Sequence, residues 1–433
     1  MRIALLSCFY PFRGGISQFN ASLYLELGKS HTVKAFNFKR QYPEFLFPGK
    51  TQYVTKDDDA VPIESEALLD TANPFTYRRT YKAIRDWKPD LVIISYWMSY
   101  FGPSLGYVAR IGKWLSENII IVLIFLASVF VSTQNKNFLS ANNIRNLLSN
   151  TAVRFIIACG VSGCLITKGT DLSAGRVAGL AACLSGILMQ RANYDQRFYP
   201  GMPEMPLIVV LLIVVALCAL IGAVNGSVIA FLKVPPFIAT LGMQTLVYGA
   251  CLVYTGAIPI GGLRSDYTGL ATGYVGTRML SNLTIIAIFI GLFMWFLYNK
   301  TRYGKYMYAI GGNENAAEVA GINVNKSKIL IYMLAGALYG LTGFLVCAKS
   351  GGCSVNTAQG WELEAIAGCT IGGVSVNGGV GTIPGILIGV LVFEVLKIVL
   401  QFLGVESSYT YIAQGLVIII AVALDLRKYL AKK

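Results

Sequence analysis

The sequence predicts an α-helical, polytopic membrane protein with about ten transmembrane helices, preceded by a partial α/β segment. The first observation is an uneven distribution of charge, because residues 1–113 hold 25 charged side chains whereas the remaining 320 residues hold 33. The second is that long apolar runs fill the later part of a chain that is 55% hydrophobic overall. The charged part is typical of a soluble domain and the apolar part of membrane helices. We therefore expect two domains, residues 1–112 and residues 113–433.

The first domain alternates short apolar strands with amphipathic helices. We expect strands at residues 3–7, 32–38 and 91–96, and helices at residues 16–28 and 74–87. This order predicts half of a Rossmann-like parallel sheet. The Gly14-Gly15 pair before a helix is compatible with phosphate binding at the helix N-terminus. A plain tight turn is the better interpretation, because a single glycine pair is a weak signal.

This domain resembles the start of the acceptor domain of GT-B glycosyltransferases. The resemblance rests on Phe9-Tyr10-Pro11 and Gly14-Gly15 in the first loop, and on Lys88-Pro89-Asp90 before a strand. The second Rossmann domain, which binds the sugar nucleotide in that family, has no counterpart, because apolar sequence begins near Asn118. We therefore expect no transferase activity, and interpret the chain as the product of a fused or chimeric gene.

Ten apolar runs follow Asn118 and are candidate membrane spans. They cover residues 118–133, 152–168, 172–190, 206–232, 236–255, 283–299, 329–347, 363–376, 383–403 and 409–424. The eighth is short and glycine-rich, which favours a broken or re-entrant helix. Ten crossings return the chain to its starting side, and no signal peptide core is visible. We therefore expect a multi-pass membrane protein with both termini in the cytoplasm, the side on which the Lys/Arg clusters at 300–305 and 427–433 then lie.

Small residues four positions apart predict close contacts between helices. They are Gly175 and Gly179, Gly222 and Gly226, Gly336 and Gly340, and Gly381, Gly385 and Gly389. Static packing is the simpler interpretation of any single pair, and helices that rock during transport are the functional one. Among the few ionisable residues in the spans, Glu394 and Lys397 are three apart, and mutual neutralisation is favoured over a proton relay.

Several classes of function lack the residues that they need. The nine cysteines are scattered and His31 is the only histidine, so neither a zinc site nor a Ser/Cys-His catalytic centre is expected. No Gly-x-x-x-x-Gly-Lys-Ser/Thr motif occurs, so the chain has no P-loop for the phosphates of ATP, and no cofactor is expected in it. If transport is powered by ATP, another subunit must hold the nucleotide. The net charge of +14 lies largely beside apolar segments, which indicates membrane lipid rather than nucleic acid as partner.

Five motifs in the second domain resemble the membrane permeases of bacterial ABC sugar importers of the ribose/galactose type. They are TKGTDLSAGR at 167–176, PPFIATLG at 235–242, YAIGGN at 308–313, ELEAIAG at 362–368 and GGVSVNGGVGT at 372–382. The ending IIAVALD at 419–425 is most similar to galactose/methyl-galactoside permeases. The resemblance runs from about Lys113 to the C-terminus. It implies a location in the cell inner membrane, and as partners a second permease copy, a periplasmic sugar-binding protein and a cytoplasmic ABC ATPase.

The same resemblance implies that a short helix between two spans docks on the ATPase. The polar stretch 310–323 has the position and chemistry of that coupling helix, because Glu314 and Glu318 share one face and Ala316, Ala317 and Ala320 form a small apolar surface. A solvated loop helix without a partner is the alternative. The coupling residues expected are Gly312, Asn313, Glu314, Ala316, Ala317, Glu318, Gly321 and Asn323.

The sugar path is less visible in the sequence. A sugar needs hydrogen-bonding groups and an aromatic surface, and the candidates are Asp171, Asn225, Gln244, Tyr248 and Trp361. For Asp171, capping of the third span is the preferred interpretation, because a carboxylate complements a helix N-terminus. Two other functions stay open: a membrane-tethered glycosyltransferase-like protein, and an ATP-independent sugar carrier or channel.

Overall fold

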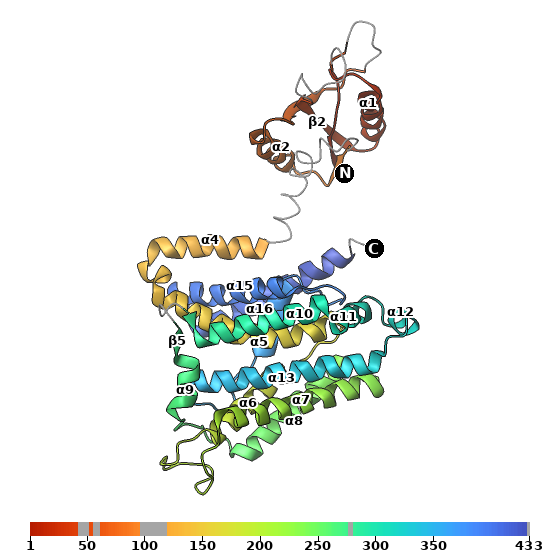
Figure 1. The fold of residues 1–433 in the computed structure, drawn as a ribbon. Coiled ribbons are helices and arrows are strands. Elements are labelled where there is room, and N and C mark those ends of the chain that lie inside the picture. Colours follow the sequence, from red (N-terminus) through yellow and green to blue (C-terminus); the bar gives the residue numbers. More distant parts are fainter. Residues whose placement is uncertain (42–51, 55–60, 96–118, 276–279, 431–433) are drawn as a thin grey trace. The chain divides into compact units, whose positions relative to one another are not determined.

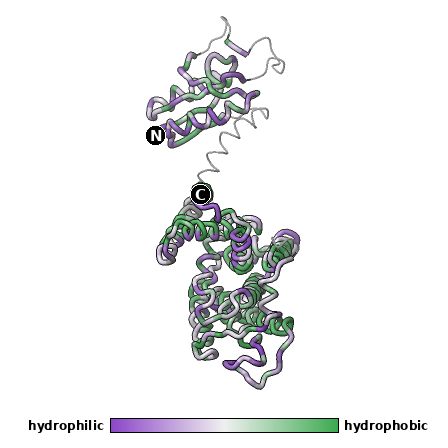
Figure 2. The backbone as a smooth tube through the Cα atoms, turned by 90° about the vertical axis from the view of Figure 1, so that its left-hand side faces the viewer, coloured by the Kyte–Doolittle hydropathy of each residue, from purple (hydrophilic) through white to green (hydrophobic). Residues whose placement is uncertain are grey.

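The computed structural model describes residues 1–41, 52–54, 61–95, 119–275 and 280–430. It divides into two compact units, Met1–Ile119 and Ile120–Lys433 (Figure 1). The domain boundary expected at residues 112 and 113 lies outside the described residues. Figure 2 shows hydrophobic colouring concentrated in the helices of the second unit, whereas the first unit alternates between hydrophilic and hydrophobic positions.

The first unit is built on a parallel four-stranded sheet. Its strands are β1 Arg2–Leu6, β2 Thr32–Arg40, β3 Ser65–Asp70 and β4 Leu91–Ile94, in the spatial order β3-β2-β1-β4. Helix α1 Gly15–Gly28 lies between β1 and β2 in the chain, and helix α2 Phe75–Asp86 lies between β3 and β4. In β1, Ile3 and Leu5 pack with Ala21 of α1, whereas Ala4 and Leu6 pack with Tyr77 of α2. The sheet is therefore covered on both faces, which explains why β1 is a continuous apolar run.

Strand β3 is the element of this unit that the sequence did not predict. It lies at the edge of the sheet, and only its last three residues are buried. Half-exposed Ser65 and Glu66 interrupt the apolar pattern, so no strand periodicity is visible there. Gly14 forms a bend directly before α1, which begins at Gly15, and it adopts a φ of 114° that other residues rarely tolerate.

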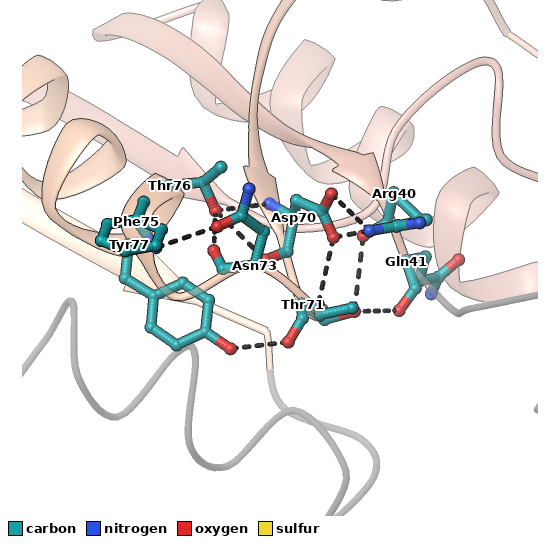
Figure 3. Close-up of polar contacts among 9 residues, drawn as sticks. Arg40, Gln41, Asp70, Thr71, Asn73, Phe75, Thr76 and Tyr77 are labelled. Atoms are coloured by element: carbon teal, nitrogen blue, oxygen red, sulfur yellow. Dashed lines mark hydrogen bonds and ion pairs between the residues drawn. The ribbon is translucent and has the colours of Figure 1, made fainter.

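Polar contacts fasten α2 to the sheet at the ends of β2 and β3 (Figure 3). Arg40 donates two hydrogen bonds to Asp70, at 3.0 and 2.9 Å, and the Tyr77 hydroxyl donates to the Thr71 carbonyl oxygen at 2.6 Å. Just after the end of β1, burial raises the pKa of the Cys8 thiol to about 12. This thiol therefore stays neutral at physiological pH and is a packing residue rather than a nucleophile.

The second unit is a bundle of helices. Their bounds are α4 Ile119–Gln134, α5 Ala141–Ile166, α6 Ala174–Leu188, α7 Leu207–Phe231, α8 Pro236–Thr255, α9 Ser265–Thr272, α10 Asn282–Lys300, α11 Arg302–Gly312, α12 Glu314–Val319, α13 Val324–Ser350, α14 Trp361–Ile371, α15 Ile383–Phe402 and α16 Ser407–Leu430. A 3-10 turn, η3 Lys136–Leu139, and a short hairpin, β5 Tyr274–Val275 with β6 Leu280–Ser281, complete it. Helices α5 and α13 are the most buried spans and form its centre.

Six helices of the described part are long and apolar enough to cross a membrane: α5, α7, α8, α10, α13 and α15. Shorter apolar helices occur at Leu123–Gln134, Ala174–Leu188 and Ser408–Ala423. The eighth expected span corresponds to α14, which has 11 residues. At about 1.5 Å per residue it covers roughly half of a hydrocarbon core about 30 Å thick. The total of ten crossings stays a prediction.

Several of the glycines spaced four residues apart lie where helix backbones meet, whereas Gly381 precedes α15 and is not helical. A Cβ on Gly222 of α7 would come within 2.1 Å of the Tyr332 carbonyl oxygen and 3.2 Å of the Gly336 Cα on α13. A Cβ on Gly389 of α15 would come within 1.9 Å of the Gly368 carbonyl oxygen on α14. The close approach predicted from the four-residue spacing is therefore confirmed at these contacts.

Candidate functional site

The polar stretch 310–323 lies at one end of the bundle, between the end of α10 and the start of α13 (Figure 1). It contains the last residues of α11, the six-residue helix α12 and a turn, so its helix is shorter than the stretch suggested. Asn313 accepts a hydrogen bond from the Ala316 backbone N–H at 3.1 Å and caps α12. Asn323 accepts one from the Lys326 N–H at 2.9 Å and caps α13. These two expected residues therefore shape the ends of helices.

The side chains of α12 point in two directions. Ala317 is buried against Ile310 and Val324, which corrects the expectation that it belongs to the exposed apolar surface. The reason is that α12 needs one apolar residue to anchor it to the bundle, and Ala317 occupies that face. Glu318 is exposed, and Val319 is 90% exposed. Val319 was missed, although it lies two residues after Ala317 and hence on the opposite side of the helix.

Glu314 and Lys328 tie α12 to α13. The Lys328 Nζ donates to both carboxylate oxygens of Glu314 at 2.8 Å, and the lysine side chain is only 12% exposed. At the same end of the bundle, Lys168 donates to the Gly312 carbonyl oxygen at 3.2 Å and Lys233 to the Asn325 side chain at 3.4 Å. Helix α12 is therefore held to α13 by an ion pair, at an end of the bundle that carries Lys168, Lys233 and Lys328.

Asp171 lies at mid-depth in the bundle. It accepts hydrogen bonds from the Ser173 backbone N–H at 3.0 Å and the Ser173 hydroxyl at 2.6 Å, and its other oxygen accepts from the Tyr339 hydroxyl at 3.1 Å. Tyr339 is near the middle of the 27-residue helix α13. The N-cap of α6 is Ser173, so the capping role expected for Asp171 is corrected. Asp171 instead fixes the non-helical backbone that leads into α6.

Asn225 of α7 joins this cluster. Its side-chain amide donates to the Ser173 hydroxyl at 3.1 Å. Thr240 of α8 donates to the Thr170 carbonyl oxygen at 3.0 Å and accepts from the Leu172 N–H at 3.1 Å. Helices α7, α8 and α13 therefore all hold the segment that precedes α6. Sequence reasoning missed Ser173, Thr240 and Tyr339 as members of this cluster; the first two belong to the motifs at 167–176 and 235–242.

The N-termini of two short helices meet beside this cluster. Helix α6 begins after non-helical residues 167–173, and α14 begins after non-helical residues 351–360. A Cβ on Gly175 would come within 2.0 Å of Glu362 Oε2, so the first turns of α6 and α14 are in contact. Among the described residues, the buried Glu362 Oε2 has no hydrogen-bond partner. We refer to α6 and α14 as the two half-helices, because each starts inside the bundle.

The aromatic candidates both contact arginines. The guanidinium of Arg176 in α6 lies 4.0 Å from the centroid of the Tyr248 ring and donates to the Val355 carbonyl oxygen at 3.1 Å. That of Arg154 lies 4.4 Å from the centroid of the Trp361 ring. Gln244 is half-buried, one turn before Tyr248 on α8. The structure thus brings Asp171, Asn225, Tyr248 and Trp361 to the region where the half-helices start.

Arg154, which contacts the Trp361 ring, also belongs to a network of four charged side chains. Arg154 of α5 contacts Glu364 at 2.8 Å and Glu394 at 2.7 Å. Lys397 contacts the same two carboxylates, at 2.5 and 3.0 Å. The neutralisation of Glu394 by Lys397 expected from their spacing is present, and Glu364 and Arg154 extend it to a neutral quartet. This balance permits four charges to lie within apolar helices.

Comparisons with known proteins identify relatives of this chain, and the family match falls within the second unit. A family model described as "Branched-chain amino acid transport system / permease component" matches residues 143–422. The galactose/methyl galactoside import permease of Salmonella typhimurium is 44% identical over 325 residues, covering 74% of this chain and 97% of that protein. The ribose import permease of Escherichia coli is 36% identical over 317 residues, covering 73% of this chain and 95% of that protein. Solved structures provide no match. The chain therefore belongs to this family of membrane permease components of import systems.

Proposed function

We propose that this chain is the permease subunit of an ATP-driven importer that moves galactose, methyl galactoside or a similar monosaccharide into the cytoplasm. The similarity to sugar permeases over nearly their full length supports a sugar rather than an amino acid as cargo. The structural observation that carries the proposal is α12, a braced helix that presents Glu318 and Val319 to solvent at a basic end of the bundle.

The partner at α12 is a cytoplasmic ATPase subunit, which supplies the nucleotide site that this sequence lacks. Exposed Ala316, Glu318, Val319 and Ala320 form its contact surface. Gly312, Asn313, Gly321 and Asn323 give the turns on either side of α12 their shape. Lys168, Lys233 and Lys328 lie at this end of the bundle, and their positive charges support its assignment to the cytoplasm. Both chain termini are assigned to the same side.

The region between the half-helices is the proposed sugar path. Helices that start at mid-depth direct their N-termini and irregular backbone at a substrate in many transporters. A second copy of the chain would complete the path along α8, which carries Gln244 and Tyr248 on a helix that is mostly unburied. A periplasmic sugar-binding protein would deliver sugar to the opposite end. A cavity of about 660 Å³ between α5, α10 and α15 has an almost wholly apolar lining and suits a lipid chain better than a sugar.

For the first unit we propose a remnant of a GT-B acceptor domain without transferase activity. The order β3-β2-β1-β4 with helices on both faces supports this, because it is the arrangement of half of a Rossmann sheet. Incubating the purified chain with sugar nucleotides tests it. Hydrolysis or transfer above the buffer control would favour the membrane-tethered glycosyltransferase instead.

The importer proposal is tested by replacing Val319 with lysine and measuring co-purification with the ATPase. We expect the variant to bind the ATPase at least about tenfold more weakly, because an exposed apolar contact becomes a charge that docking must desolvate. Tyr199→Lys, at an exposed site in the connection between α6 and α7, is the matched control and should co-purify like the unchanged chain.

Import is measured in cells that lack their own galactoside permease and that express this chain with an ATPase and a binding protein. We expect uptake of labelled methyl galactoside that Val319→Lys abolishes. Uptake that persists without the ATPase subunit would support an ATP-independent carrier. An unchanged complex together with undiminished uptake in Val319→Lys would refute the coupling assignment.

A further inference from the structure

The last turn of α11 lies where three backbone segments cross. A Cβ on Gly311 would come within 1.8 Å of the Ile166 carbonyl oxygen and 2.6 Å of the Gly379 nitrogen. Gly379 itself donates a hydrogen bond to the Ile166 carbonyl oxygen at 2.8 Å. A Cβ on Gly378 would come within 2.9 Å of both the Gly311 and the Ile166 carbonyl oxygens. We call this crossing of Ile166, Gly311, Gly378 and Gly379 the glycine joint.

The three segments lead to different parts of the proposed transport machinery. Ile166 is the last residue of α5, and the chain runs from it through residues 167–173 into half-helix α6. Gly378 and Gly379 belong to the connection 372–382, which follows half-helix α14. Gly311 comes two residues before the cap of α12. One crossing therefore links α12 to the backbone that enters one half-helix and the backbone that leaves the other.

Side-chain contacts reinforce the joint on both sides. The Tyr308 hydroxyl of α11 donates to the Gly381 carbonyl oxygen at 2.7 Å. Lys168 donates to the Gly312 carbonyl oxygen at 3.2 Å. The Asn313 N–H donates to the Ala309 carbonyl oxygen at 3.0 Å, so the single non-helical residue between α11 and α12 is hydrogen-bonded to α11. A displacement of α12 would therefore reach both connections through hydrogen-bonded backbone.

We propose that the glycine joint is a positioning device that moves both half-helices together when a partner displaces α12. The physical reason is stiffness: at this crossing backbone touches backbone, so no side-chain rotamer can absorb the displacement, and close-packed contacts transmit it. The N-termini of the half-helices meet at Gly175 and Glu362, so a coordinated shift opens or closes that contact. The inference rests on the proposed importer function and adds the residues that carry the motion.

The test compares Gly311→Ala with Gly415→Ala in the full chain, assembled with its ATPase and binding protein in liposomes. Gly415 is a matched control, because it is helical, in α16, and a Cβ there meets nothing within 4 Å. Both the ATP hydrolysed and the sugar imported are measured per assembled complex. We expect Gly311→Ala to lower the sugar imported per ATP about tenfold while hydrolysis continues, and Gly415→Ala to match the unchanged chain.

A gentler variant decides the question if Gly311→Ala does not assemble. Tyr308→Phe removes one hydrogen bond from the joint, and we expect it to lower the sugar imported per ATP about two- to tenfold. Tyr306→Phe on the same helix is its control. If Gly311→Ala or Tyr308→Phe imports as much sugar per ATP as the unchanged chain, the proposal is wrong and the glycine joint is static packing. This holds whether or not the variant yields less folded complex. Failure of the unchanged chain to import at all would instead refute the proposed function.

Discussion

At the scale of single residues, the neutral quartet of Arg154, Glu364, Glu394 and Lys397 shows how the bundle tolerates charge. Each side chain is at most 20% exposed, and each cation contacts both carboxylates. The quartet fastens α14 to α5 and α15 through Glu364. Its stability depends on charge balance, because an unpaired charge in such a position is costly whereas a matched set is not.

Arg154→Met is predicted to destabilise the protein by about 3–5 kcal/mol, because it leaves two buried carboxylates facing one ammonium. The measurement is the thermal unfolding midpoint of the detergent-solubilised full chain. The double variant Arg154→Met with Glu394→Gln restores neutrality and should recover much of the loss. Equal destabilisation in the single and double variants would show that packing of the arginine, rather than charge balance, is what matters.

At the scale of elements, helix pairing depends on glycines that leave room for backbone. Helices α7 and α13 approach through Gly222 and Gly336, each of which would place a Cβ against a carbonyl oxygen of the other helix. Lipid offers no hydrophobic drive for such pairing, so the close van der Waals contact itself stabilises it. The same device joins α14 and α15 at Gly368 and Gly389.

Gly222→Ala is predicted to separate α7 from α13 and destabilise the bundle by about 1–3 kcal/mol, the usual range for overpacking a close-packed site. Gly249→Ala in α8 is the control, because a Cβ there meets nothing within 4 Å. Both variants are compared by the amount of folded protein in membranes and by unfolding midpoint in detergent. A Gly222→Ala protein as stable as Gly249→Ala would mean that the two helices can separate without loss.

At the scale of the whole molecule, the chain consists of two units with separate cores. The first has a parallel sheet packed on both faces, and the second has a helical core centred on α5 and α13. The family match covers residues 143–422 and so lies entirely within the second unit. The residues that match the permease family therefore all belong to the second unit.

Removing residues 1–112 is predicted to leave sugar uptake per assembled complex unchanged. The reason is that the half-helices, the glycine joint and α12 all belong to the second unit. Uptake of methyl galactoside by the shortened and full chains is compared at equal membrane content. A folded but inactive shortened chain would assign a transport role to the first unit, and faster uptake would show that this unit obstructs its partners.

Features that depend on local sequence could be predicted, whereas features that depend on contacts between distant residues could not. Apolar runs located the membrane helices, because hydropathy is a local property, and the short eighth run indicated the short helix α14. Strand β3 was missed because an edge strand that starts with half-exposed Ser65 and Glu66 has no apolar pattern. Ala317 was placed on the wrong face, since a six-residue helix is too short for periodicity to reveal which side faces the bundle.

The sequence by itself determined the class of protein, the course of most helices, the glycines suited to close contact and the polar stretch that holds α12. These follow from composition and spacing along the chain. Only the tertiary structure decided that Gly175 meets Glu362, that Arg154 completes the charge quartet and that Gly311 crosses Ile166 and Gly379. Such contacts join residues far apart in sequence, and their geometry is set by how whole helices pack against one another.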